Sequence, residues 1–413
     1  MRKSTFIFII LSGLASLCNY VVYPILARIL SPNEFVDISV ALALFTQLSS
    51  FMLSIVALTI GLSKQEGEQT ARKVVEKLQA ILTHLFVVII IVFLASSPLF
   101  LDRLHMPATL LAPISIMLGL SISMSVISGY LNGKQKLEKL GLSIVFSALM
   151  QLLFSVAAAV ITKSGAVTLA AMAFGSFVAI ALTYRVYQSE HLPRPSSVFE
   201  HGPSLYRSKE VRSLVTFTIA SSIATLIMNL LLIADLLIIS SRQIDAKIYT
   251  DMYVISRAVF FAGMLFVWPF LSNIDVMHPS RITRLFARLV ALFIALSGGA
   301  IAIMSMFGND VLHILLGSNY SQRTDLQTMA ILAITYKLLF LIISTLTLFF
   351  IVVRSYWAVY LPIILTCFSA IALWFAGPQS STLELVTSLN VASIAAVVLG
   401  FVGFFLVGKK SKR

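Results

Sequence analysis

Four charged side chains lie within or at the edge of stretches of sequence that are otherwise apolar. Arg257 and Lys337 fall inside such stretches, Arg28 closes the first of them, and Asp235 lies near the end of a later one. Because a charge in the middle of a bilayer costs roughly 2.5–3.5 kcal/mol on insertion scales, such residues usually face the interior of a helix bundle and mark function. Arginine grips a phosphate group through paired hydrogen bonds, and lysine attracts it as a point charge. These residues therefore indicate binding of an anion such as a diphosphate.

The depth of each charge decides how readily it could reach the membrane surface. Lys337 lies about 11 residues into its stretch, about 16 Å at the helical rise per residue, and Arg257 lies about 13 Å deep by the same measure. Arg28 is closer to an edge and could instead extend its side chain to the surface. Asp235 could be the structural partner of Arg257 or Lys337.

Three uncharged residues of the first two apolar stretches complete the predicted site. Asn19 and Gln47 are the preferred additional contacts to a bound molecule, although amides in apolar helices more often join one helix to another by hydrogen bonds. Pro24 follows Asn19 in the same stretch and is the expected hinge, although a proline can also bend a helix only for packing.

Motifs for the chemistry of soluble enzymes are absent from the sequence. It contains no Walker A run, no GxGxxG, no HExxH and no GxSxG. Its two cysteines, Cys18 and Cys367, both lie in apolar stretches and form no zinc-binding pattern. We therefore predict no enzyme activity, no metal site and no cofactor.

The elements that carry these residues are predicted to be membrane-spanning helices. The chain has 413 residues, of which 59% are hydrophobic and only 11% are charged, whereas soluble domains are nearer 25% charged. A bilayer is crossed by about 20 apolar residues in helical form. The sequence predicts spans at roughly 4–27, 35–62, 78–97, 108–131, 140–161, 165–187, 212–240, 248–273, 285–307, 326–353, 355–376 and 384–407.

The basic residues predict the orientation of these spans. Most of the 30 Lys and Arg residues fall at the two ends of the chain and in every second gap between spans. Loops rich in Lys and Arg stay in the cytoplasm, so both termini are predicted to be cytoplasmic. The net charge of +13 follows from these loops, and we predict membrane lipids, not nucleic acid, as its surroundings.

The longest polar gap divides the predicted spans into two sets of six. Prolines at 193, 195 and 203 make this gap a linker and not a helix. We predict an all-α membrane protein of about 12 transmembrane helices, with two six-helix lobes around a central cavity. The lobes are residues 1–190 and 212–413, the linker is 191–211, and the chain ends in a short basic tail.

Several motifs, taken in their order and spacing, resemble those of a known family. They are ARILSPNEF at 27–35, GYLNG at 129–133, ADLLIIS at 234–240 followed by Tyr249 and Arg257, and LGSNY at 316–320. Together they resemble the polysaccharide flippases, the O-antigen-type branch of the multidrug/oligosaccharidyl-lipid/polysaccharide exporter superfamily. The sequence departs from the family pattern at Val36 and Ile248, where that pattern often has glycine.

The resemblance implies a function and a location. It implies a flippase that moves an undecaprenyl-diphosphate-linked oligosaccharide from the inner to the outer leaflet of a bacterial cytoplasmic membrane, by alternating access through a cationic cavity. Arg28, Asp235 and Arg257 match positions that the family places in or near that cavity, whereas Lys337 is added from its depth alone. Coupling to H+ or Na+ through Asp235 is one option. A glycan polymerase and other export machinery are the further partners that this role implies.

Three other functions are alternatives to a flippase for a membrane protein of this sequence. An ion-coupled drug or metabolite exporter of the same fold would need acidic side chains inside the first six spans, which contain almost none. A membrane glycan polymerase or ligase would need a large outer loop with catalytic polar groups, and residues 308–325 are too poor in such groups. A scaffold without transport activity would not need charges buried in the membrane.

Overall fold

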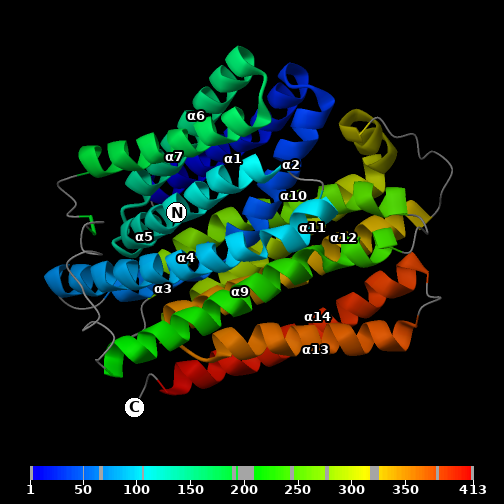
Figure 1. Cartoon of the computed structure of the whole chain (residues 1–413). Coiled ribbons are helices and arrows are strands. Elements are labelled where there is room, and N and C mark those ends of the chain that lie inside the picture. The colour runs from blue at the N-terminus through cyan, green and yellow to red at the C-terminus, as the bar shows by residue number, and fades with distance from the viewer. Residues whose placement is uncertain are drawn as a thin grey trace. The chain divides into compact units, whose positions relative to one another are not determined.

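The computed structural model describes residues 3–49, 51–64, 68–104, 107–187, 192–193, 209–241, 246–274, 279–316, 325–377 and 381–410, and these form helices and turns with no strand among them (Figure 1). The helices are α1 (Lys3–Ile29), α2 (Pro32–Ser49), α3 (Met52–Ser63), α4 (Glu68–Leu104), η1 (Ala108–Leu110), α5 (Leu111–Gly133), α6 (Leu137–Thr162), α7 (Gly165–Val186), α9 (Lys209–Ser241), α10 (Ala246–Ser272), α11 (Pro279–Leu316), α12 (Asp325–Val352), α13 (Trp357–Ala376) and α14 (Thr382–Lys410).

These helices confirm the predicted fold class, an all-α membrane protein. Within the described residues, ten helices are long and apolar enough to cross a bilayer, and two shorter apolar helices lie at Lys3–Asn19 and Met52–Ser63. Helices satisfy every backbone hydrogen bond internally, as hydrocarbon surroundings require. The chain is therefore a multi-pass integral membrane protein.

The second predicted span, residues 35–62, is not one helix. The structure divides it into α2 and α3, with Phe51 in the turn after Ser49. Serine hydroxyls next to the break bond backbone carbonyls: Ser49 Oγ donates to Thr46 O at 3.1 Å, and Ser54 Oγ donates to Phe51 O at 2.6 Å. Serine side chains compete in this way with the helical hydrogen bonds. Mean hydropathy cannot detect such a break, because the residues on both sides remain apolar.

The closely spaced tenth and eleventh predicted spans are separate helices. α12 ends at Val352 and α13 begins at Trp357. Arg354, the charged residue of this short gap, has a φ of 53°. A non-glycine residue in the left-handed region is typical of a tight turn, so the chain reverses within four residues.

The chain forms two compact units, Met1–Ser222 (unit 1) and Ile223–Arg413 (unit 2), and the division falls inside α9. The predicted linker, 191–211, precedes this division, and residues 194–208 lie outside the described part of the chain. The predicted lobe boundaries therefore remain a prediction.

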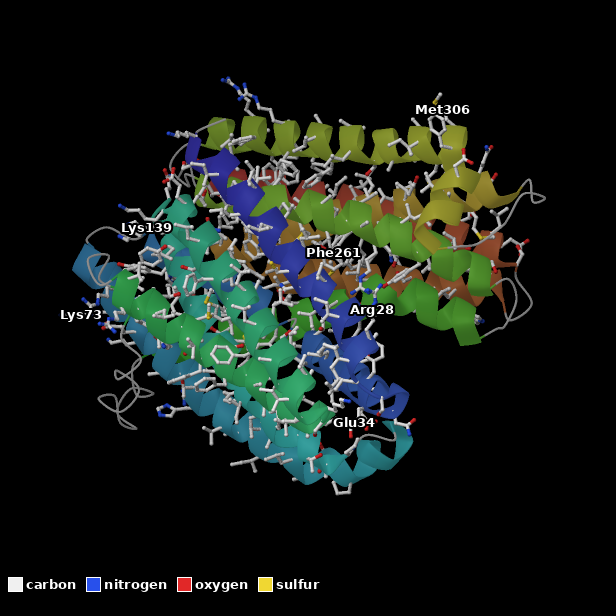
Figure 2. The ribbon with its side chains drawn as sticks, turned by 90° about the horizontal axis from the view of Figure 1, so that it is seen from above. Arg28, Glu34, Lys73, Lys139, Phe261 and Met306 are labelled. Atoms are coloured by element: carbon white, nitrogen blue, oxygen red, sulfur yellow. The ribbon has the colours of Figure 1, made fainter. Side chains whose placement is uncertain are left out.

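In unit 1 the closest helix pairs are α6 with α7, α1 with α6, and α3 with α5. A side chain on Gly129 of α5 would lie 2.5 Å from Thr59 Cβ and 2.7 Å from Val56 O of α3. Small residues let membrane helices approach closely where no hydrophobic force draws them together. Figure 2 shows the charged ends of this unit: Arg28 and Glu34 lie towards one end, and Lys73 and Lys139 towards the opposite end.

In unit 2, α12 is the central helix and contacts α10, α11, α13 and α14. Within its span, Gln327–Val352, 67% of an 18-residue apolar stretch is buried. Aromatic rings fill the space between α12, α11 and α14, with the Phe349 and Phe404 centroids 4.9 Å apart and those of Phe286 and Phe404 5.0 Å apart. This central position explains how α12 can carry a lysine that is completely removed from the surroundings of the protein.

Candidate functional site

Lys337 lies in the core of unit 2 and is 0% exposed. Its Nζ donates a hydrogen bond of 2.6 Å to the carbonyl oxygen of Leu232 in α9. The same ammonium lies 4.6 Å from the ring centroid of Tyr253 and 4.7 Å from that of Tyr336. A cation over an aromatic face gains about 0.5–1 kcal/mol when exposed and about 2 kcal/mol or more when desolvated. The carbonyl and the two rings thus offset part of the cost of burying this charge.

Arg257 lies in α10 and also contacts the Tyr253 ring. Its guanidinium carbon is 5.9 Å from the Tyr253 centroid and 5.2 Å from that of Phe261. Its Nε is buried and has no hydrogen-bond partner among the described residues, but the side chain as a whole is only partly buried. Phe261 is 49% exposed. Arg257 is therefore the accessible cation of the pair.

The structure brings Arg257 and Lys337 together through Tyr253, which is 3% exposed and contacts both cations. Sequence reasoning selected the two charges and missed the rings. A signal was present, because Tyr253, Arg257 and Phe261 follow one another at intervals of four residues on α10 and so share one face of that helix.

A second hydrogen bond joins α12 to α9 beside the first. The hydroxyl of Tyr336 donates to Leu231 O at 3.1 Å, next to the bond from Lys337 to Leu232 O. Two consecutive residues of α12 thus bind two consecutive carbonyls of α9. Tyr336 is itself 1% exposed.

The other predicted site residues lie apart from this cluster or outside the described side chains. Arg28 and Asn19 are both exposed on α1. Pro24 and Gln47 lie within the helical ranges of α1 and α2, and Asp235 within that of α9, but the side chains of these three lie outside the described residues. Their predicted roles in hinge motion, substrate contact and charge pairing remain predictions.

Glu34, in the motif that follows the first helix, has a structural role. Its Oε2 accepts a hydrogen bond of 2.5 Å from the backbone N–H of Gly165, the first residue of α7. A carboxylate at a helix N-terminus satisfies a backbone donor that the helix leaves free and interacts favourably with the helix dipole. Glu34 therefore fixes the start of α7 to the start of α2.

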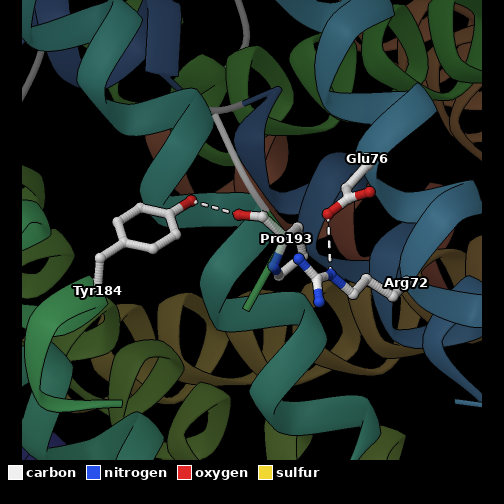
Figure 3. A network of polar contacts seen from close by, with 4 residues as sticks. All are labelled: Arg72, Glu76, Tyr184 and Pro193. Carbon is white, nitrogen blue, oxygen red and sulfur yellow. Dashed lines mark hydrogen bonds and ion pairs between the residues drawn. The ribbon is translucent and has the colours of Figure 1, made fainter. Parts of the chain in front are cut away.

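A polar network lies at the opposite end of unit 1 (Figure 3). The Tyr184 hydroxyl donates to Pro193 O at 2.9 Å, and Arg72 Nε pairs with Glu76 Oε1 at 2.9 Å. Leu192, which precedes Pro193, is 5% exposed. Leu192 and Pro193, which follow α7, are thus packed onto unit 1.

Tyr187, just beyond the end of α7, is half-buried at the same end. Burial raises the pKa of its hydroxyl, and a hydrogen bond with Ser143 and the nearby charge of Lys139 partly offset that effect. Lys139 Nζ lies 5.6 Å from the Tyr187 ring centroid. Basic residues at this end are therefore partly held by aromatic side chains.

No protein-family model and no curated relative matches the sequence. Solved structures do match it over nearly the whole chain. A crystal structure of a MATE mutant has a TM-score of 0.79 at 13% identity and covers 99% of this chain and 95% of its own. An outward-facing multidrug resistance MATE family transporter of the MOP superfamily has a TM-score of 0.77 at 13% identity, with coverage of 99% and 95%.

A third structure is a MOP superfamily transporter from Pyrococcus furiosus, for which reversed polarity of the binding pocket suggests a different function. It has a TM-score of 0.76 at 13% identity and covers 99% of this chain and 95% of its own. Identities this low show a shared fold and nothing more. The chain thus has the fold of the MATE transporters of the MOP superfamily.

Proposed function

We propose that this chain is a transporter that moves an undecaprenyl-diphosphate-linked oligosaccharide from the inner to the outer leaflet of a bacterial cytoplasmic membrane. The observation that carries the proposal is the cationic cluster of unit 2, in which Arg257 is partly accessible beside Lys337. A guanidinium binds a phosphate group through paired hydrogen bonds. The diphosphate is the part of the substrate that Arg257 of this cluster would hold.

In this proposal the protein alternates between inward-open and outward-open states with the headgroup bound, while the prenyl tail stays in the lipid. The membrane potential, negative inside, favours outward movement of an anion by about 2.3 kcal/mol per charge per 100 mV. H+ or Na+ is the coupling ion to consider if a further driving force is needed, with Asp235 as its site. A glycan polymerase and other export machinery would take the product on the outer side.

A drug exporter is the second function to weigh, because one neighbour in fold is a multidrug resistance transporter. Exporters of cationic compounds need acidic side chains within their spans, and the first six predicted spans of this chain contain almost none. The neighbour from Pyrococcus furiosus is a case in which the polarity of the pocket suggests a different function within one fold. The basic cluster therefore favours the anionic substrate.

The proposal is tested in a bacterial strain whose surface glycan depends on this chain. Arg257→Ala should abolish surface glycan while the protein remains in the membrane at its normal level. Arg284→Ala, which removes the same charge from an exposed position on α11, should leave it unchanged. Normal surface glycan with Arg257→Ala at a normal protein level would refute the proposal.

A further inference from the structure

We propose that Lys337 does not contact the substrate but fixes Tyr253, and through it Arg257, in the orientation in which the guanidinium binds an anion. That the anion is a substrate rests on the proposed function. The positioning of Arg257 by Lys337 and Tyr253 does not. Lys337 and Tyr253 are thus positioning residues of this site, and Arg257 is the residue that touches the ligand.

The surroundings of Lys337 leave it no surface to offer to a ligand. Its side chain is 0% exposed, and its ammonium lies between the Leu232 carbonyl oxygen and the rings of Tyr253 and Tyr336. Withdrawing the ammonium from these contacts would leave a buried carbonyl and two rings without their cation. Breaking these contacts would leave the buried ammonium without its partners, which is unfavourable.

The same contacts suit a positioning role. The 2.6 Å hydrogen bond ties α12 to α9, and the contact with Tyr253 ties α12 to α10. The paired bonds from Tyr336 and Lys337 to consecutive carbonyls restrict sliding or rotation of α12 against α9. The Tyr253 ring is consequently in contact with a cation that is itself fixed by a hydrogen bond.

Among the described residues, the rings of Tyr253 and Phe261 are the contacts that order the guanidinium of Arg257. Its contacts with Tyr253 and Phe261 are at 5.9 Å and 5.2 Å, and its Nε lacks a partner among the described residues. Phe261 is half-exposed, whereas Tyr253 is the buried one of the two rings that contact Arg257. Moving Tyr253 would therefore change the orientation of Arg257, although Lys337 never meets the ligand.

The first measurement follows the position of Arg257 without any substrate. Phenylglyoxal modifies arginine side chains, and mass spectrometry of the full-length protein in detergent gives the rate at Arg257. We expect Lys337→Met and Tyr253→Leu each to raise this rate roughly thirtyfold, the factor that corresponds to loss of one desolvated cation–π contact. Tyr253→Phe keeps the ring and should leave the rate at its wild-type value.

Arg72 provides the control within the same molecule. It is also partly buried, with its side chain 22% exposed and paired with Glu76, and it belongs to unit 1. A general loosening of the protein would raise the rate at Arg72 as well, and that result would refute a specific positioning role. An unchanged rate at Arg257 in Lys337→Met or Tyr253→Leu would also overturn the proposal.

The second measurement uses inorganic pyrophosphate as the probe and isothermal titration calorimetry as the readout. Lys337→Met should weaken binding in the wild-type background and have no further effect in the Arg257→Ala background. A further loss in that background would make Lys337 a direct ligand and contradict the proposal. If the wild-type protein fails to bind pyrophosphate, the function proposed above is in error, and the phenylglyoxal rates still decide the positioning role.

Discussion

At the scale of single residues, two charged side chains of this apolar chain have partners that come from other helices. Lys337 is held by a carbonyl of α9 and a ring of α10, and Glu34 is held by the first N–H of α7. Hydrogen bonds of this kind, with one ionised member, are roughly twice as strong as neutral ones. The charges therefore also fix how the helices pack.

Replacing Glu34 tests this role in unit 1. Glu34→Ala removes both the hydrogen bond to Gly165 and the charge at the N-terminus of α7, and we expect a loss of about 1–2 kcal/mol of stability. Glu34→Gln should lose less, since it keeps an acceptor. Thermal unfolding of the purified protein gives the comparison.

Glu138→Ala is the matched control, because Glu138 is exposed in the first turn of α6. It should change the melting temperature less than Glu34→Ala does. Equal effects of the two substitutions would show that the contact with Gly165 contributes nothing specific.

Sequence alone found the charges at this scale but not their partners. Arg257 and Lys337 were visible because a charge in an apolar stretch is rare and costly. Tyr253 and Phe261 could have been selected by their spacing from Arg257. The bond from Gly165 to Glu34 joins residues 131 positions apart, and no local pattern encodes such a pairing.

At the scale of helices, close packing depends on residues that leave room for a neighbouring backbone. Gly129 faces Val56 and Thr59 of α3, where a Cβ would come within 2.7 Å of a backbone oxygen. A backbone atom cannot move aside as the end of a side chain can. The α3–α5 pair therefore requires glycine at this position.

Gly129→Ala is expected to destabilise unit 1 by about 1–3 kcal/mol, the usual cost of overpacking. Gly13→Ala on α1 is the control, because a Cβ at Gly13 meets nothing within 4 Å. It should be neutral or stabilising, since alanine favours a helix by about 0.5–1 kcal/mol over glycine. The melting temperatures of the two variants test this prediction. A melting temperature of Gly129→Ala equal to that of the wild type would contradict the packing described.

The attachment of the chain after α7 gives a further prediction at this scale. Tyr184→Phe removes the hydrogen bond to Pro193 O while keeping the ring. We expect faster hydrogen exchange at the backbone N–H of Leu192, because opening of this segment becomes easier. Exchange followed by mass spectrometry measures the change.

Tyr187→Phe is the corresponding control. It also removes a hydroxyl at this end of α7, but that hydroxyl bonds with Ser143 and not with Pro193. It should leave exchange at Leu192 unaltered. Unchanged exchange in Tyr184→Phe would show that burial of Leu192, and not the hydrogen bond, holds the segment.

Helices were predictable where the bilayer dictates them and less so where side chains interrupt them. Long apolar stretches gave most helices, including the separation of α12 from α13 beside Arg354. The division of residues 35–62 into α2 and α3 was missed, because the residues on both sides of the break are apolar and keep the mean hydropathy high. Helix boundaries of this kind depend on hydrogen bonds that a composition window does not register.

At the scale of the whole molecule, fold and function separate. The fold is shared with MATE transporters at 13% identity or less among the structures compared, because many sequences satisfy the same bilayer and packing constraints. In the proposed function the substrate depends instead on the sign of a few charges, among them the partly accessible Arg257 of unit 2. The fold therefore follows from pattern, whereas the substrate must be established by experiment.

The most direct test is transport by the purified protein in lipid vesicles. Vesicles would contain an undecaprenyl-diphosphate-linked oligosaccharide with a fluorescent glycan, and a membrane-impermeant quencher would report its movement between leaflets. We predict that the wild-type protein and Arg284→Ala accelerate this movement, that Arg257→Ala does not, and that a cationic drug is not transported. Transport of the cationic drug without movement of the glycolipid, or glycolipid movement unaffected by Arg257→Ala, would contradict the account.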